Sequence, residues 1–153
     1  MKTKKHPSWK EAVDRVVDRV NTTGRGCFIS HDEILGWFDL EEPSTVEGYK
    51  KFSFLRLQYV EQMKEELLVE HNIFLMNDRG LGYVVLHPDD QVVLAPATYM
   101  KKALTQIRKA ADSVLHVDST KLSASGHADR RRNLAKLAFL SSTVSSRRLS
   151  IWY

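Results

Sequence analysis

Basic side chains gather at two places where they could neutralise phosphate groups or contact the edges of bases. Lysine and arginine bind phosphate oxygens and also form hydrogen bonds to guanine. Serine forms hydrogen bonds to phosphates or to base edges. The first group falls in one short segment and a glycine-rich turn: Lys50, Lys51, Ser53, Arg56 and Arg79. The second group lies nearer the C-terminal end: Lys101, Lys102, Arg130, Arg131, Arg132 and Lys136. Both groups predict contact with nucleic acid.

The three consecutive arginines predict a belt rather than a reading face. Neighbouring residues of a helix point about 100° apart, so residues 130–132 cannot share one side. Basic side chains on several sides of a helix can contact the phosphates of a curved nucleic-acid backbone, but they cannot read bases together. Two other interpretations stay open, a solvated surface and pairing with the acidic Glu65, Glu66 and Glu70. A single-strand or RNA binder driven by this belt is also open, and it would not need Arg79.

The charge is unevenly distributed along the chain. Residues 1–20 carry +3, residues 21–98 carry −7 and residues 99–153 carry +8, for a net charge of +4. A basic C-terminal region favours an acidic partner, most often nucleic acid. The alternative is that the acidic middle and the basic end attract each other, within one chain or between chains.

Residues suited to catalysis or metal binding do not form a known pattern. Cys27 precedes His31 by four positions, but the cysteine falls in an apolar run and is expected to be a buried structural thiol. His31, Asp32, Glu33 and His71 lack the HExxH or CxxC spacing of metal sites. We therefore expect no enzyme activity, no metal and no cofactor.

Length and composition favour a globular protein inside the cell. The 153 residues, 42% apolar and 27% charged, fit one domain or a small domain with a helical extension. A single cysteine fits a reducing compartment. No run of about 18 apolar residues and no signal-peptide core occurs. The sequence thus predicts a cytoplasmic protein without a membrane span.

Capping patterns mark the first helices. Ser8 with Glu11 and Ser30 with Glu33 match the capping box, in which a serine three positions before a glutamate closes a helix start. Apolar residues follow each at helical spacing. These patterns predict one helix after Ser8 and a second over residues 31–38.

A weaker cap and a long apolar stripe predict the third helix. Ser44 with Glu47 gives a third start, and the apolar positions from Phe52 describe one face of a long helix ending near His71. Its aromatic residues are expected in the core, together with those elsewhere in the first half of the chain: Trp9, Trp37, Phe38, Phe52, Phe54, Tyr59 and Tyr83.

The spacing of apolar residues then changes to that of strands. Residues 73–76 and 81–86 read as two strands around a turn at 77–80. After a short acidic loop, Pro96 is expected to open the next helix, because proline suits the first helical position. Residues 118–127 read as a polar loop or hinge, followed by a last helix from about Ala128 that ends before Arg147.

The resulting order resembles the winged-helix fold, which has three helices followed directly by a β-hairpin wing. The segment Arg79-Gly80-Leu81-Gly82-Tyr83 is also similar to the RGxGY of wings in OmpR-type response-regulator effector domains. The chain departs from that family because it lacks a receiver domain and has two further helices. The resemblance implies an α+β, mostly helical fold, with a winged-helix domain over residues 1–90 and a basic helical extension over residues 91–153. That extension would pack on the domain or mediate dimerisation.

Two functions follow as expectations. The first is a small regulatory protein that binds double-stranded DNA, alone or as a homodimer, with the third helix reading a groove and the wing holding the backbone. The second is an adaptor or inhibitor that engages a protein complex of the host through an acidic winged-helix surface, consistent with a phage or mobile-element origin. Its candidate contacts are Glu61, Glu65, Glu66, Glu70, Trp152 and Tyr153.

Overall fold

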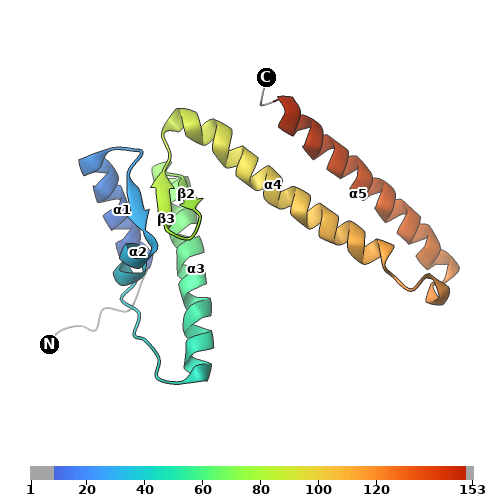
Figure 1. The fold of residues 1–153 in the computed structure, drawn as a ribbon, viewed down its shortest axis with the longest axis horizontal. Helices are drawn as coiled ribbons and strands as arrows, with labels where there is room; N and C mark the ends of the chain where they lie inside the picture. Colours follow the sequence, from blue (N-terminus) through green and yellow to red (C-terminus); the bar gives the residue numbers. More distant parts are fainter. Residues whose placement is uncertain (1–8, 151–153) are drawn as a thin grey trace. The chain divides into compact units, whose positions relative to one another are not determined.

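The computed structural model describes residues 9–150, with side chains through residue 145. The chain divides into two compact units after Gln91, and each is described by itself. Five α-helices and one small antiparallel sheet make up the part described (Figure 1). The expectation of an α+β, mostly helical fold is therefore confirmed. The predicted cap at Ser8 and the residues Trp152 and Tyr153 lie outside the described residues.

Unit 1 alternates helices with short strands. The elements are α1 (Trp9–Thr23), β1 (Phe28–Ser30), α2 (His31–Trp37), α3 (Val46–His71), β2 (Leu75–Asp78) and β3 (Gly82–Val85). The strands pair antiparallel in the order β1-β3-β2, so β3 is central. Ile29 of β1 and Asn77 of β2 both lie opposite Tyr83 of β3.

The core of unit 1 lies between the sheet and the first three helices. The side chains at its centre are aliphatic or aromatic and almost fully buried. They are Ala12, Val13 and Val16 from α1, Ile29, Leu75 and Val85 from the sheet, Ile34 and Phe38 from the α2 region, and Met63 and Leu67 from α3. Because α3 contributes only from its second half, that half is the part of the helix that the core holds.

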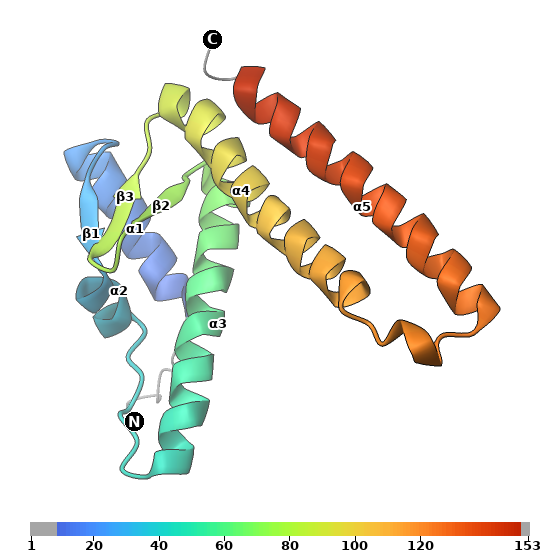
Figure 2. The ribbon, with the colours of Figure 1, turned by 45° about the vertical axis from the view of Figure 1, so that its right-hand side comes forward.

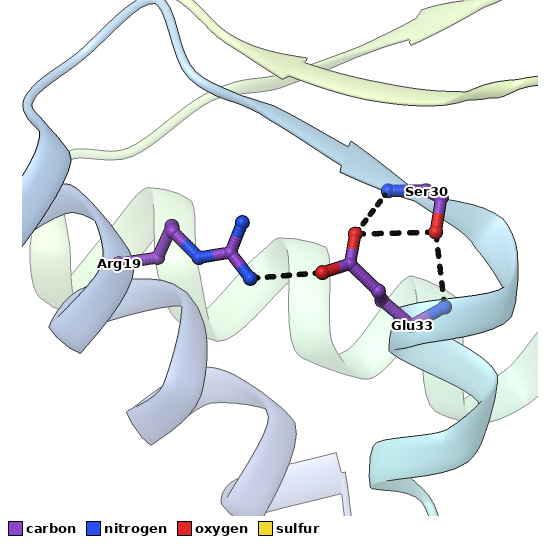
Figure 3. Close-up of polar contacts among 3 residues, drawn as sticks. All are labelled: Arg19, Ser30 and Glu33. Carbon is purple, nitrogen blue, oxygen red and sulfur yellow. Dashed lines mark hydrogen bonds and ion pairs between the residues drawn. The ribbon is translucent and has the colours of Figure 1, made fainter.

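The start of α2 is closed by the predicted capping box and joined to α1 (Figure 3). The Ser30 hydroxyl accepts a bond from the Glu33 backbone N–H at 3.2 Å, and a Glu33 carboxylate oxygen accepts one from the Ser30 N–H at 2.9 Å. Arg19 donates to the other carboxylate oxygen at 2.8 Å. The Ser30 N–H and then Arg19 hold the pKa of Glu33 below its ordinary value.

Helix α3 is one continuous helix of 26 residues. Its N-cap is Thr45, whose hydroxyl accepts from the Gly48 N–H at 3.1 Å, so the expected cap at Ser44 was wrong by one position. It ends at His71 as predicted, where Asn72 takes a left-handed conformation (φ 55°). The next N–H, that of Ile73, returns to the Leu67 carbonyl at 2.9 Å, as in helix C-caps of this kind.

The hairpin turn lies one residue later than expected; the first strand lies two residues later than expected at the same length, and the second strand is shorter. Leu81 N–H donates to the Asp78 carbonyl at 2.8 Å, and Arg79 (φ 24°) and Gly80 (φ 83°) both have positive φ. Ile73 and Phe74 are buried but precede β2: the Ile73 N–H closes α3, and the Phe74 carbonyl accepts from the Leu86 N–H at 3.1 Å. At Gly82 a Cβ would lie 2.3 Å from the Ile29 carbonyl oxygen, so this glycine permits the close approach of β1 and β3.

Unit 2 consists of most of α4 (Pro88–Leu115), a short 3-10 helix (Ser119–Lys121) and α5 (Ala124–Ser150). Figures 1 and 2 show α4 and α5 side by side and running in opposite directions. Helix α4 opens at Pro88, so the expectation that Pro96 opens it was wrong and Pro96 lies inside the helix. The acidic segment expected to be a loop is therefore helical, and its Asp89 and Asp90 suit the positive N-terminal end of α4.

The connection to α5 is shorter than predicted. The loop expected over residues 118–127 ends at Ser123, whose hydroxyl accepts from the Gly126 N–H at 3.1 Å. Helix α5 therefore begins at Ala124 rather than Ala128, and it continues through Ser150 instead of ending before Arg147. A search of the helices in the described residues finds none long and apolar enough to cross a membrane.

Candidate functional site

Helix α3 changes its surroundings halfway along its length. In residues 59–71, the anchored half, Met63 and Leu67 are 0% exposed. In residues 46–58, the protruding half, no side chain is buried. Figures 1 and 2 both show this half extending beyond α1 and the sheet. It is about 20 Å of helix at 1.5 Å per residue, presented to whatever unit 1 binds.

One face of the protruding half combines basic, apolar, amide and acidic side chains, the acidic one being the exposed Glu47 in the first turn of α3. Lys50, Phe54, Leu57 and Gln58 follow one another at the spacing of one helix face, and all are exposed. We call these four residues the reading face. Phe54 is 71% exposed and Leu57 is 67% exposed. Lys51 is exposed beside them.

The expectation that Phe54 belongs to the core was wrong. Phe52 and Phe54 are two positions apart and point about 200° apart on a helix, so they cannot both face the body. Phe52 is half-buried, with its ring centroid 5.9 Å from that of Tyr49. This spacing was the signal in the sequence that one of the two rings is exposed. Of the other aromatic residues expected in the core, Phe38 and Tyr83 are buried, and Trp9, Trp37 and Tyr59 are half-buried.

Arg56 turns from the reading face toward the body of unit 1. Its guanidinium carbon lies 5.4 Å from the centroid of the Phe52 ring, and the residue is half-buried. Arg56 and Ser53 line a pocket of about 450 Å³ together with Tyr83. The start of α2 and an apolar wall supply the remaining lining: His31, Asp32, Ile34, Leu35, Leu57 and Val60.

Tyr83 fastens the base of the β2–β3 hairpin, which corresponds to the wing of the winged-helix resemblance, to this pocket. It is 7% exposed, and its ring meets that of His31 edge-on at a centroid distance of 4.8 Å. The Lys64 ammonium nitrogen lies 5.6 Å from the Tyr83 centroid. Burial, and to a smaller extent the Glu61 carboxylate, raises the pKa of Tyr83, so the phenol stays neutral at physiological pH. Arg79 is exposed at the tip of the wing.

The acidic residues predicted to contact a protein partner differ in their bonding partners and in their exposure. Glu66 accepts a hydrogen bond from the Trp9 indole N–H at 2.9 Å and so holds α1 to α3. Glu61 pairs with Lys64 at 3.4 Å. Glu65 and Glu70 are exposed. An acidic docking surface would therefore rest mainly on Glu61, Glu65 and Glu70.

The basic residues of α4 stand in solvent. Lys101 and Lys102 are exposed, and the Lys102 ammonium nitrogen lies 5.6 Å from the centroid of the Tyr99 ring. This arrangement holds the charge against an aromatic face without burying it. Both lysines remain accessible to an acidic partner.

The arginine belt of α5 is partly used inside unit 2. Arg130 donates to the Val114 and Leu115 carbonyls, each at 3.2 Å, and so satisfies orphan carbonyls at the end of α4. Arg132 pairs with Asp129 at 3.3 Å. Arg131 and Lys136 are exposed. The belt therefore divides into one structural arginine and three accessible basic residues.

In the described part of the chain, no three His, Cys, Asp or Glu side chains lie close enough to hold a metal ion. Cys27 is half-buried directly before β1. Comparisons with protein-family models, with curated proteins and with solved structures gave no match.

Proposed function

We propose that the chain is a small regulatory protein that binds double-stranded DNA, with the protruding half of α3 in the major groove. The observation that carries this proposal is the exposed half-helix with Lys50 and Lys51 near its start, on the same unit as the wing and its exposed Arg79. A helix with side chains is about 10–12 Å across and the major groove is about 12 Å wide, so the two dimensions match.

The arrangement of unit 1 supports this assignment. Its three helices followed directly by a β-hairpin agree with the winged-helix resemblance of the sequence and support the proposal. In that arrangement the third helix reads bases and the wing contacts the backbone. Lys50, Lys51 and Arg79 would then neutralise phosphates, while Arg56 braces the helix against Phe52 rather than reaching a base.

Unit 2 would add affinity that does not depend on sequence. Residues 92–153 carry eleven basic and three acidic side chains, a net charge of +8. Lys101, Lys102, Arg131 and Lys136 would contact phosphates, and α4 with α5 would pair two copies where the protein acts as a dimer. Two half-sites about one helical turn apart would match such a dimer.

The test is fluorescence anisotropy with labelled duplex and single-stranded DNA over a salt series. Wild type is expected to prefer duplex, and its affinity should fall steeply with salt because counterions are released from phosphates. The variant Lys50→Ala/Lys51→Ala should weaken binding and reduce the salt slope by about 2, because each lysine that neutralises a phosphate contributes about 1. Lys121→Ala, which removes an exposed charge between α4 and α5, is the matched control and should keep most of the affinity.

Failure to bind duplex at about 50 mM salt, where phosphate contacts are strong, would rule out the proposal. Preferential binding to single strands, unaffected by Arg79→Ala, would point instead to the arginine belt of α5. Equal reductions in affinity for Lys50→Ala/Lys51→Ala and for Lys121→Ala would remove α3 as the reading helix.

A protein partner is the second candidate, and the exposed apolar residues of α3 favour it. Val46 is 79% exposed and Tyr49 is 51% exposed, in addition to Phe54 and Leu57. With Glu61 and Glu65 on the following turns, this surface would suit a partner that has an apolar groove beside basic residues. Capture of one specific protein by wild type but not by Phe54→Ala/Leu57→Ala, together with absence of duplex binding, would establish this alternative.

A further inference from the structure

The reading face of α3 carries two large apolar side chains where a DNA-binding helix also needs polar contacts. Phe54 and Leu57 are more than 65% exposed, and they are adjacent on the helix at an interval of three positions. Exposed apolar clusters of this kind indicate a contact surface. On the proposed function, on which this inference rests, the surface they touch is the floor of the major groove.

The chemistry of the major groove restricts what these side chains can meet. The edges of adenine, guanine and cytosine present hydrogen-bonding groups there, whereas thymine also presents its C5 methyl group. Phenylalanine and other apolar side chains contact that methyl group. Phe54 and Leu57 therefore fit thymine better than any other base.

The amide group of Gln58 also favours A·T pairs. It is exposed four positions after Phe54, on the same face. A glutamine amide can accept from the N6 amino group of adenine and donate to its N7. The apolar side chains and the amide are thus complementary to the two bases of an A·T pair.

The side chain best suited to guanine is turned away from this face. Arg56 lies two positions after Phe54, about 200° around the helix, and its guanidinium carbon is 5.4 Å from the centroid of the Phe52 ring. Lys50 and Lys51 precede Phe54, nearer the helix start, and supply charge for phosphates. Residues 46–58 carry Lys50, Lys51 and Arg56 against one acidic residue, Glu47, and this net positive charge favours DNA as the occupant of the apolar face. The centre of the reading face has no arginine.

We infer that the chain prefers A·T-rich sites and recognises thymine methyl groups through Phe54 and Leu57, with Gln58 on adenine. The probes are three labelled duplexes of equal length: alternating dA·dT, the same duplex with deoxyuridine in place of thymidine, and alternating dG·dC. Deoxyuridine lacks only the C5 methyl group, so it isolates the interaction in question.

The expected order of affinity is dA·dT, then the deoxyuridine duplex, then dG·dC. Each methyl group that is removed from the interface should weaken binding by roughly fourfold, the equivalent of one buried CH₂ group. In Phe54→Ala the dA·dT and deoxyuridine duplexes should bind much more equally. Phe139→Ala is the matched control, because Phe139 on α5 is 70% exposed, and it should keep the full methyl effect. Phe54→Ala leaves the core of unit 1 intact, and its melting temperature verifies that it is folded.

The outcomes separate this inference from the proposed function. Duplex binding with equal affinity for all three probes would overturn the A·T preference and leave the DNA-binding function standing. A methyl effect that survives in Phe54→Ala/Leu57→Ala would also overturn the inference, because the methyl group would then be read elsewhere. No binding to any of the three duplexes would overturn both.

Discussion

The two halves of α3 belong to one helix but have opposite surroundings. Residues 59–71 place Met63 and Leu67 in the core and bond to α1 through Glu66, whereas residues 46–58 bury no side chain and expose the reading face. The C-terminal half is held by packing against the body of unit 1. The N-terminal half has no buried side chain and is held mainly because it continues the C-terminal half of the same helix. A small domain can in this way extend an exposed helical surface without building a second core.

The largest expected difference separates two leucines, one in each half. Leu67→Ala should lower the free energy of unfolding by about 2–5 kcal/mol, because it leaves a cavity in the core. Leu57→Ala, at a position that is 67% exposed, should change it by no more than about 0.5 kcal/mol. Urea denaturation followed by circular dichroism measures both. Equal losses of stability would show that residues 46–58 are packed as firmly as residues 59–71.

The wing offers a similar contrast between two glycines. Gly82→Ala should cost about 1–3 kcal/mol, because its Cβ would meet the Ile29 carbonyl oxygen and force β1 from β3. Gly80→Ala has open space around the Cβ and should cost about 1 kcal/mol through its positive φ. Thermal unfolding compares the two variants. A larger destabilisation for Gly80→Ala would mean that the turn, not the close approach of the strands, limits the wing.

The N-caps Ser30 of α2 and Thr45 of α3 allow the same comparison between a helix start beside the core and one on the protruding half. Ser30→Ala should cost about 1 kcal/mol of global stability, because the cap lies next to the core and joins the Arg19–Glu33 pair. Thr45→Ala should cost less, since the protruding half can fray locally while the body stays folded. Denaturation curves report the first effect. Faster amide exchange confined to the first turns of α3 reports the second, and a global destabilisation by Thr45→Ala would contradict the local picture.

The smallest effect concerns the charge of Glu33. Its pKa is lowered in the folded state, so its stabilising contribution is present above the ordinary carboxyl pKa and is lost as pH falls through the folded value. Glu33→Gln keeps the capping pattern and removes the charge. At pH 7 the variant should be less stable by at most about 1 kcal/mol, since the pair with Arg19 is partly exposed. The difference should shrink in acid; a constant difference would exclude the charge as its cause.

The sequence predicted much of the fold because several local signals are strong. The capping box at Ser30, the end of α3 at His71 and the hairpin around Gly80 all depend on residues within a few positions of each other. The start of α4 was missed because Pro88 and Pro96 both suit a first helical turn. Choosing between them requires knowing that residues 88–95 already form a helix.

The candidate site was predicted less completely for a related reason. Hydrophobicity assigns Phe54 to the core, but exposure depends on where the body of unit 1 ends along α3, which is a property of the fold. Likewise, Arg130 appears in the sequence as one of three equal arginines. Only the position of α5 beside the end of α4 shows that its guanidinium satisfies backbone carbonyls.

Hydrogen exchange with and without duplex DNA tests the division of α3 most directly. The predicted result is slower amide exchange on DNA addition in residues 46–58 and at the wing turn, residues 78–81, with little change in residues 59–71, whose exchange is already slow. Protection confined to α4 and α5, with residues 46–58 exchanging as fast as before, would contradict the assignment of this half-helix as the reader of DNA.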